Sequence, residues 1–268
     1  MPISIATWNI NSVRLRIGLV TGFLDQYNPD VLCLQEIKCQ TDLFPLEAFR
    51  ERGYRHIFVN GQKGYHGVAI VSKKPFADSA VRGFCGKIDS RHASVDIRDR
   101  DDTIRLHNFY VPAGGDEPDP EINEKFAHKL AFLDEMKSWL KGTETDRKAI
   151  LLGDLNIAPH ENDVWSHKQL LKVVSHTPIE VEGLETVRSA GGWIDAVREH
   201  IPTDQKLFTW WSYRSSDWEA SDRGRRLDHI WVTPQLAPQL RGIEVVRVAR
   251  SWQKPSDHVP VIATIASA

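Results

Sequence analysis

Residues 148–156 read KAILLGDLN, a short apolar run that ends in a glycine, an aspartate and, one leucine later, an asparagine. A run of this length between polar residues is typical of a buried strand. The preceding residues 122–140 have a different period, with an apolar inner face made of Ile122, Phe126, Leu130, Leu133, Met136 and Leu140. This spacing predicts a long amphipathic helix. A buried strand that directly follows such a helix favours the α/β class.

Outward from this point, the same reading predicts ten further strands, at residues 3–9, 31–36, 54–59, 67–73, 93–99, 103–112, 206–214, 225–233, 243–249 and 259–265. Two further helices are predicted at 12–27 and 46–52, and residues 158–200 are the least regular part. So many strands and so few long helices indicate two mixed β-sheets packed face to face with helices outside. No Gly-, Ser- or Pro-rich linker and no internal repeat divides the sequence, so we expect residues 1–268 to form a single domain.

The composition is that of an ordinary globular protein, with 41% apolar and 26% charged residues and a formal net charge of -2. Bulk charge therefore does not indicate nucleic-acid binding, although a local basic face remains compatible with it. The N-terminal residues show no signal-peptide pattern, and no apolar stretch is long enough for a membrane span. The three cysteines form no CxxC pair. We therefore expect a cytoplasmic, reduced protein with no membrane contact.

Acids and amides follow the predicted strands with unusual regularity. They are Asn9, Asn11, Glu36, Asp154, Asn156, Asp228 and Asp257, joined by Tyr110 and His258. Any one of them taken alone is a plausible turn or cap residue. Strand ends on one side of a sandwich converge, however, so these groups are expected to share one pocket. Such an oxygen-rich set suits Mg²⁺, with Mn²⁺ as a substitute, far better than zinc.

The pocket chemistry narrows the reaction class. The sequence contains no GxSxG, HExxH or Walker motif, which argues against the mechanisms those motifs serve. Crowded carboxylates repel each other unless a cation lies between them. Metal-assisted attack of water on a phosphate ester is therefore the best match.

Several motifs now identify a resemblance. They are TWNINSVRLR, LQEIK, QKGYHGVAI, NFYVP, LLGDLNIAP, FTWWSYR, RRLDHIWV and KPSDHVPV. Together and in this order they closely resemble the exonuclease III and apurinic/apyrimidinic endonuclease family, over nearly the whole chain. The resemblance implies a four-layered α/β sandwich, dependence on Mg²⁺ and hydrolysis of DNA phosphodiesters. The activities it implies are 3′→5′ exonuclease action on duplex DNA, incision at abasic sites and cleaning of 3′ ends.

The resemblance also implies roles for individual residues. Glu36 resembles the principal metal carboxylate, and the implied metal set is Asn9, Glu36, Asp154, Asn156, Asp257 and His258. Asp154 matches the residue that activates the attacking water. The implied catalytic set is Tyr110, Asp154, Asn156, Asp228 and His258, in which a cationic imidazole oriented by Asp228 stabilises charge on the phosphate.

The implied partner is double-stranded DNA with abasic sites or 3′ ends, bound by a monomer that would be nucleoid-associated in a bacterium. The implied DNA-binding set is Asn11, Lys63, Arg91, Trp210, Arg214 and Leu227. Lys63, Arg91 and residues 223–226 could hold DNA phosphates. The alternative for each of them is a solvated surface charge with no role in DNA binding. Trp210 and Trp211 are adjacent, so strand alternation predicts that one is core, and we assign the pocket to Trp210.

The sequence departs from the family after two motifs. Ala113 follows YVP where the family has an asparagine or glutamine. The loop after GDLNIAP carries Asn162 as its only asparagine, together with Trp165 and His167, which we expect to crowd the pocket. The balance among the three activities therefore stays open.

Two other functions are compatible with parts of the pattern. A phosphatase or phosphodiesterase of the same fold that acts on a non-DNA phosphoester, such as a lipid or inositol phosphate, would share GDLN and SDH. A non-catalytic DNA-binding module would be expected to lack part of the acid and amide set, and none is missing.

Overall fold

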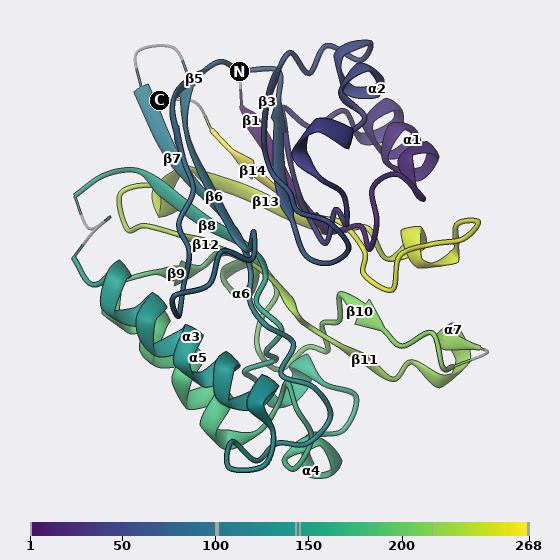
Figure 1. Cartoon of the computed structure of the whole chain (residues 1–268), viewed down its shortest axis with the longest axis vertical. Coiled ribbons are helices and arrows are strands. Elements are labelled where there is room, and N and C mark those ends of the chain that lie inside the picture. Colours follow the sequence, from purple (N-terminus) through teal and green to yellow (C-terminus); the bar gives the residue numbers. More distant parts are fainter. Residues whose placement is uncertain (1, 100–101, 143, 145, 216, 267–268) are drawn as a thin grey trace.

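The computed structural model describes residues 2–99, 102–142, 144, 146–215 and 217–266. Within them the chain forms two six-stranded sheets and a small two-stranded arm. Figure 1 shows the two large sheets lying against each other, with helices on the two outer sides.

The first sheet has the strand order β13-β14-β1-β2-β4-β3. Its strands are β1 (Ile3–Asn9), β2 (Val31–Gln35), β3 (His56–Asn60), β4 (Val68–Ser72), β13 (Leu240–Val245) and β14 (Val261–Ile265). β1 is parallel to β2 and antiparallel to β14. The sheet is therefore mixed, and the first strand of the chain pairs with the last.

The second sheet has the strand order β5-β6-β7-β8-β12-β9. Its strands are β5 (Phe76–Ala80), β6 (His92–Asp99), β7 (Asp102–Tyr110), β8 (Ala149–Asp154), β9 (Ile194–Asp195) and β12 (Asp228–Val232). β7 is parallel to β8, whereas β12 is antiparallel to it. The acidic ends of β8 and β12 are consequently paired, with Asp154 opposite Asp228.

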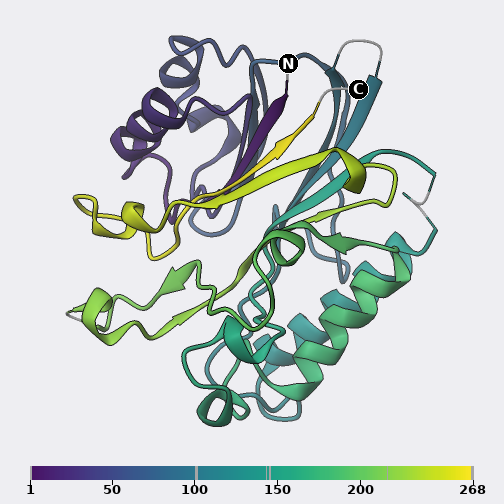
Figure 2. The same cartoon turned by 180° about the vertical axis from the view of Figure 1, so that it is seen from behind.

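Three apolar clusters define four layers. The cluster between the sheets joins residues such as Ile5 and Cys33 of the first sheet to Leu106 and Leu152 of the second. The outer face of the first sheet packs against α1 (Ile17–Tyr27) and α2 (Leu46–Arg50). The outer face of the second packs against α3 (Glu124–Leu140) and α5 (Pro178–Ala190) (Figure 2). The predicted α/β sandwich with helices outside is confirmed.

The remaining elements are short. They are α4 (His167–Leu170), α6 (Ala196–His200), α7 (Trp218–Ser221), β10 (Trp210–Trp211) and β11 (Gly224–Arg225). The 3₁₀ turns lie at Thr41–Leu43, Glu161–Asp163, Ala237–Gln239 and Arg247–Ser251. Figure 1 shows β10 and β11 as an arm that carries α7 at its tip.

Several predicted bounds differ from the structure. The strand predicted at 206–214 is reduced to Trp210–Trp211, and the strand predicted at 243–249 ends at Val245 before a 3₁₀ turn. β5 was not predicted, because it lies at the sheet edge and exposes four of its five residues. Ile122 precedes α3 and is 73% exposed, so its assignment to the inner face was wrong.

No helix within the described ranges is both long enough and apolar enough to cross a lipid bilayer.

Candidate active site

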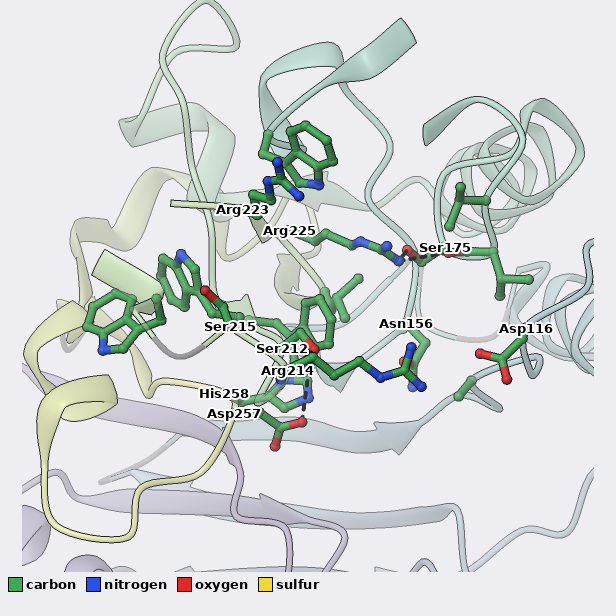
Figure 3. A pocket seen from close by; sticks show the side chains of 18 of the residues that line it. Asp116, Asn156, Ser175, Ser212, Arg214, Ser215, Arg223, Arg225, Asp257 and His258 are labelled. Atoms are coloured by element: carbon green, nitrogen blue, oxygen red, sulfur yellow. Dashed lines mark hydrogen bonds between the residues drawn. The ribbon is translucent and has the colours of Figure 1, made fainter. Parts of the chain in front are cut away.

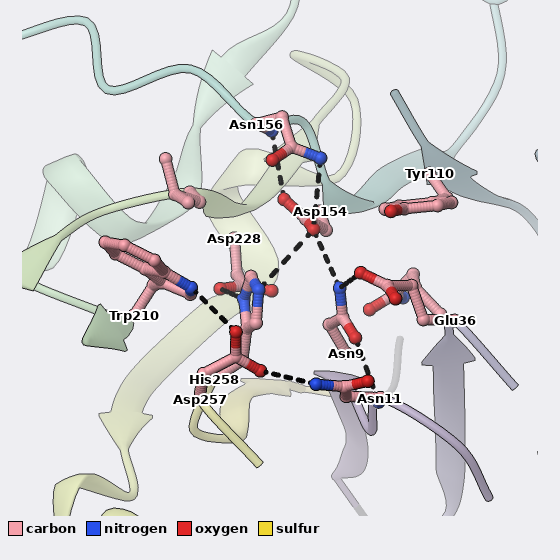
Figure 4. A network of polar contacts seen from close by, with 12 residues as sticks. Asn9, Asn11, Glu36, Tyr110, Asp154, Asn156, Trp210, Asp228, Asp257 and His258 are labelled. Atoms are coloured by element: carbon pink, nitrogen blue, oxygen red, sulfur yellow. Dashed lines mark hydrogen bonds and ion pairs between the residues drawn. The ribbon is translucent and has the colours of Figure 1, made fainter. Parts of the chain in front are cut away.

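The polar strand ends meet at a cavity of about 840 Å³. Eight residues of the implied catalytic, metal and DNA-binding sets line it, namely Glu36, Tyr110, Asn156, Trp210, Arg214, Leu227, Asp257 and His258. Figure 4 shows that Asn9, Asn11, Asp154 and Asp228 lie within the same network of contacts. Segments from both sheets and from both ends of the chain therefore build one site.

The backbone turns sharply where three of these side chains leave their strands. Asn11, Glu36 and Asn156 have φ angles of 49°, 48° and 55°, in the left-handed region. A glutamate with positive φ is uncommon, and such conformations persist only where the surrounding structure holds them. Here the Asn11 amide donates to Asn9 Oδ1 (3.0 Å), and the Asn156 amide donates to Asp154 Oδ1 (3.0 Å). The turns are thus held by the site's own polar groups.

Asn9 at the end of β1 connects the two sheets. Its Nδ2 donates to Glu36 Oε1 (3.0 Å) and to Asp154 Oδ2 (2.8 Å). The other oxygen of Glu36 is paired with Lys38 Nζ at 2.8 Å. Burial alone would raise the pKa of Glu36, but Lys38 and Asn9 outweigh it and lower that pKa. Glu36 is therefore an ionised carboxylate, and Asn9 and Lys38 fix its position.

Asp154 is an almost fully buried acid of the site. Besides Asn9, its carboxylate accepts hydrogen bonds from Asn156 Nδ2 (3.2 Å) and the Asn156 amide. Burial raises the pKa of Asp154, and the negative charges of Asp228 and Glu36 raise it further. The neighbouring His258 lowers this pKa but does not cancel the rise. A carboxylate whose pKa is raised towards neutrality is a better proton acceptor than an ordinary aspartate.

His258 lies between two acids. Its Nδ1 is 2.8 Å from Asp228 Oδ2, and its Nε2 is 3.7 Å from Asp154 Oδ2. Burial lowers the pKa of His258, but Asp228, Asp154 and Asp257 outweigh it and raise that pKa above its ordinary value. The raised pKa favours the protonated imidazole at neutral pH. Although these three residues are close enough to form a metal cluster, their contacts are those of an ion-paired relay.

Asp257 and Asn11 form a separate pair at the cavity wall. Asn11 Nδ2 donates to Asp257 Oδ1 (3.1 Å), and Trp210 Nε1 donates to Asp257 Oδ2 (3.0 Å). Burial would raise the pKa of Asp257, but His258, Trp210 and Asn11 lower it below its ordinary value. In the described structure both oxygens of Asp257 are engaged in orienting its neighbours.

Tyr110 ends β7 and lines the cavity from the second sheet. Burial raises the pKa of its phenol far above the ordinary value, and Glu36 and Asp154 raise it further. The phenol is therefore a neutral hydrogen-bond donor. Arg91 lies with its guanidinium 5.0 Å from the Tyr110 ring centre and pairs with Asp89 Oδ2 at 2.5 Å. Arg91 thus supports Tyr110 in this structure and does not line the cavity.

The carboxylates of the site fit a hard divalent cation. Glu36 and Asp154 share one amide nitrogen of Asn9, so their negative charges lie close together. Burial is the main cause of the raised pKa of Asp154, and the negative charges of Asp228 and Glu36 raise it further. The atoms that could serve as ligands here are oxygens, which Mg²⁺ and Mn²⁺ prefer. Glu36 and Asp154 are the carboxylates that could hold such a cation.

The two adjacent tryptophans differ in environment. Trp211 is 1% exposed and packs in the outer core of the first sheet. Trp210 is half-buried and lines the cavity together with Leu227. Trp211 also contributes to the cavity lining, but of these two adjacent tryptophans Trp210 exposes more surface to a bound molecule.

The other predicted positions are spread around the cavity. Arg214 lines it as an exposed side chain, whereas Lys63 lies on an exposed loop outside its lining. Trp165 and Ala113 both line it. His167 does not, because its Nδ1 faces His176 Nε2 at 2.8 Å. Of the two residues expected to crowd the pocket, Trp165 alone faces it.

Sequence reasoning missed three supporting residues. The Lys129 ammonium, buried on α3, donates to the carbonyl oxygen of Asn156 (2.8 Å). Thr209 Oγ1 donates to Asp228 Oδ2 (2.6 Å), and Trp8 Nε1 donates to the His258 carbonyl (3.0 Å). A lysine on the apolar face of the predicted helix was the only signal for Lys129, and nothing local distinguished Thr209 or Trp8.

Comparison with known proteins gives a consistent set of relatives. The sequence profile described as "Endonuclease/Exonuclease/phosphatase family" matches residues 6–258. Exodeoxyribonuclease III of Haemophilus influenzae is 31% identical over 268 residues, spanning 96% of this chain and 97% of that protein. DNA repair nuclease APEX1 of Danio rerio is 28% identical, spanning 98% of this chain and 82% of that protein.

Solved structures agree with the sequence relatives. An AP endonuclease from Archaeoglobus fulgidus superposes with a TM-score of 0.90 at 30% identity, covering 99% of this chain and 100% of that chain. The 3′ phosphatase NExo from Neisseria, bound to a product DNA hairpin, superposes with a TM-score of 0.90 at 29% identity over 99% and 100% of the two chains.

Proposed function

Because the chain belongs to the Endonuclease/Exonuclease/phosphatase family, we propose that it is an Mg²⁺-dependent DNA-repair nuclease that hydrolyses DNA phosphodiesters. The observation that carries this proposal is the single hydrogen-bonded network that joins Glu36, Asp154 and His258 at the cavity (Figure 4). Its activities would be 3′→5′ exonuclease action on duplex DNA, incision at abasic sites and cleaning of 3′ ends. Relatives named as an exodeoxyribonuclease, an AP endonuclease and a 3′ phosphatase support these three activities.

In the proposed mechanism, Asp154 takes the proton of the attacking water. Its raised pKa suits this role, and Asn9 and Asn156 fix the direction of its carboxylate. The protonated His258 and the neutral phenol of Tyr110 then donate to the phosphate oxygens, where negative charge increases in the transition state. Asp228 keeps the imidazole charged and oriented.

We propose that Glu36 and Asp154 provide the carboxylate oxygens for Mg²⁺, or Mn²⁺ in its place. When bound, the cation would supply charge neutralisation at the phosphate and at the departing 3′ oxygen. Asn9 and Asn156 would support the cation site through the carboxylates that they orient, and Asp257 would act through Asn11. His258 would serve the phosphate and not the metal, because both of its ring nitrogens face acids.

DNA would bind across the cavity mouth. Trp210 and Leu227 offer an apolar recess beside His258, and Arg214 offers a positive charge at the rim. Asn11 would act through Asp257 and Arg91 through Tyr110. Lys63 would contact the backbone outside the cavity, where a phosphate contact is independent of sequence.

We further propose that the chain acts as one domain and as a monomer, in the cytoplasm and on the nucleoid if the source is bacterial. The shared core between the sheets supports the single domain, because a boundary between the sheets would cut through it.

Activity on DNA with and without metal tests the proposal. One labelled duplex set carrying an abasic site, a recessed 3′ end or a 3′-phosphate is incubated with Mg²⁺ and, in parallel, with EDTA. We expect cleavage with Mg²⁺ and none after chelation, restored by added Mn²⁺. Full activity after rigorous chelation would contradict the mechanism. Stronger competition by an inositol phosphate or phospholipid than by duplex DNA would favour the non-DNA phosphoester alternative.

The position of the cation is tested by Glu36→Gln. This change keeps the size of the side chain but removes one ligand charge, so the Mg²⁺ concentration at half-maximal rate should rise. Asp25→Asn is the control, because Asp25 pairs with Arg52 at the surface and does not line the cavity. An unchanged metal requirement in Glu36→Gln would locate the cation elsewhere.

A further inference from the structure

Arg225 places a cation inside the recess beside the candidate catalytic residues. It belongs to β11, lines the cavity, and lies with its guanidinium carbon 5.3 Å from the centre of the Trp210 ring. Figure 3 shows its side chain extending across the cavity towards Ser175. Its neighbours in the lining are both apolar, such as Trp210, Leu227 and Val174, and polar, such as Ser175 and Asn156.

The position of the guanidinium is fixed by a chain of buried contacts. Arg225 Nη1 donates to Ser175 Oγ (2.7 Å) and to the Val174 carbonyl (2.9 Å). Ser175 is 4% exposed, and its own amide donates to both oxygens of Glu180 at 2.9 Å. Glu180 in turn pairs with the buried Lys129 at 2.5 Å. The guanidinium is therefore held in place before any ligand arrives.

The charge of Arg225 has no carboxylate partner in the described part of the chain. Nη1 uses neutral acceptors, and Nε has no hydrogen-bond partner there. The adjacent Arg226 is different, because it is paired with Asp163 and Asp195 at 2.8 Å each. Glu180 does not fill this role for Arg225, because Lys129 already neutralises it. A half-buried guanidinium without a counter-ion therefore binds an anionic ligand more favourably than it binds an uncharged ligand.

We propose that Arg225, held by Ser175, is a specificity-determining residue that makes this recess select a 3′-terminal phosphomonoester over an uncharged deoxyribose. The proposal rests on the proposed DNA hydrolysis. A 3′-terminal phosphate carries more negative charge than an internal diester, and Arg225 compensates that extra charge. A sugar placed in the recess would instead cover the guanidinium and leave it without a counter-charge.

The reaction selected in this way is balanced without a further reactant. The oxygen of water forms a new bond to phosphorus, and the bond between phosphorus and the 3′ oxygen breaks. Of the two water protons, one ends on the 3′ oxygen and the other stays with the phosphate. The products are a 3′-hydroxyl end and inorganic phosphate.

The test compares kcat/KM on three duplexes of one sequence, which carry a 3′-phosphate, a recessed 3′-hydroxyl or an internal abasic-site analogue. Arg225→Met keeps an unbranched chain over Trp210 but removes the charge. We expect it to raise the ratio of abasic incision to 3′-phosphate removal by at least about tenfold, the size of one charge-assisted hydrogen bond. Arg225→Lys should restore most of the wild-type ratio.

Arg223→Met is the matched control, since Arg223 lines the same cavity and lies over Trp165 at 4.8 Å. This variant should change kcat/KM on all three duplexes by a similar factor. Binding of the 3′-phosphate duplex in EDTA, measured by fluorescence anisotropy against the 3′-hydroxyl duplex, should weaken selectively in Arg225→Met. Melting temperatures of all variants confirm that each is folded.

Two results would overturn the inference. The first is that Arg225→Met lowers kcat/KM by the same factor on all three duplexes. The second is that Arg223→Met lowers kcat/KM on the 3′-phosphate duplex as selectively as Arg225→Met does. Both leave the nuclease function standing, because the wild type still cleaves DNA. A wild-type chain inert on all three duplexes with Mg²⁺ would instead overturn the proposed function, and this inference with it.

Discussion

At the scale of single residues, the site depends on charges that are buried in pairs. Asp154 and His258 face each other within the network, and Asp228 fixes the far side of the imidazole. Each group is oriented by at least one hydrogen bond before substrate arrives. Such preorganised groups act mainly on the transition state, so their removal should affect turnover more than binding.

We expect Asp154→Asn and His258→Asn each to lower kcat by at least about 10²-fold while leaving the Kd for duplex DNA within a few-fold. Single-turnover cleavage and fluorescence anisotropy measure the two quantities. His167→Asn is the matched control, because that ring faces His176 outside the cavity and should keep near-normal turnover. Near-normal turnover in either site variant would remove that residue from the mechanism.

The paired tryptophans separate binding from stability. Trp211→Ala opens a cavity in the core and should destabilise the fold by about 3–5 kcal/mol. Trp210→Ala should cost less stability because Trp210 is half-buried, although the change also removes its hydrogen bond to Asp257. It should lose activity on abasic or frayed 3′ ends, because the apolar contact that Trp210 offers is worth roughly 1–3 kcal/mol by analogy with base stacking. Chemical denaturation and the ratio of abasic to intact-duplex cleavage report the two effects. Equal loss of stability in both variants would return Trp210 to the core.

At the residue scale, the sequence predicts a group better when that group ends a strand. Glu36, Asp154 and His258 follow apolar runs or precede one, so pattern alone places them together. Lys129 and Ser175 act through contacts between α3, α5 and the loop before α5, and no local pattern specifies such contacts. The lack of a counter-ion at Arg225 is likewise a property of the folded chain, since its neighbour Arg226 looks the same in the sequence.

At the scale of elements, Gly153 determines how closely β8 approaches β7. Its φ is +134°, and a Cβ at this position would overlap with the Phe109 carbonyl oxygen. The next residue is Asp154, so any shift of β8 moves the proposed base. The glycine of the GDLN motif is thus required by strand packing.

Gly153→Ala should therefore destabilise the protein by at least about 1–3 kcal/mol and lower kcat as well. Gly22→Ala provides the control, because Gly22 is an exposed residue of α1 where an added methyl group would have no atom within 4 Å. That change should stabilise by roughly 0.5–1 kcal/mol through helix propensity. Melting temperature and turnover of both variants are compared, and a fully active, stable Gly153→Ala would contradict the packing argument.

Helices and strands could be predicted from the sequence where burial of one or both faces imposes a regular pattern of apolar residues. The buried strands β2, β4 and β8 read as apolar runs, and the long helix α3 shows its inner face. β5 has no such period because it is exposed at the sheet edge. β10 is only two residues long, because Trp210 and Trp211 pair with the short β11 and Trp210 forms just one further bridge, to His258. Tertiary pairing, which the sequence does not display, sets these bounds.

At the scale of the whole molecule, a buried ion network ties the loops behind the site to the second sheet. Asp163 is fully buried and pairs with Arg226 at 2.8 Å and Arg198 at 2.5 Å. Burial would raise the pKa of Asp163, but Arg226 and Arg198 outweigh it and lower that pKa. The folded state therefore binds this proton less readily than the unfolded state. The stabilisation is present above about pH 4, the ordinary aspartate range, and is lost as the pH falls through the lowered pKa.

Asp163→Asn should cost about 3–5 kcal/mol at pH 7, because the buried Arg198 loses its carboxylate partner and the buried Arg226 keeps only Asp195. Only the wild type loses this stabilisation in acid. The difference in unfolding free energy between the two proteins should therefore shrink as the pH falls below about 4. Urea unfolding across that range measures the effect. Asp25→Asn, which breaks a surface pair with Arg52 where Asp25 is 58% exposed, should cost at most about 1 kcal/mol. A difference that is constant with pH would exclude the ionised Asp163 as its source.

The pairing of β1 with β14 has a consequence for synthesis of the protein. Asn9 ends the first of these strands and His258 precedes the second, and Trp8 donates to the His258 carbonyl. A ribosome makes β1 long before β14. Until β14 emerges, the nascent chain holds Asn9, Glu36 and Asp154 without the imidazole that completes the proposed site. A growing polypeptide would therefore be unable to degrade nucleic acid near the ribosome, and cleavage would begin only once the two strands have paired.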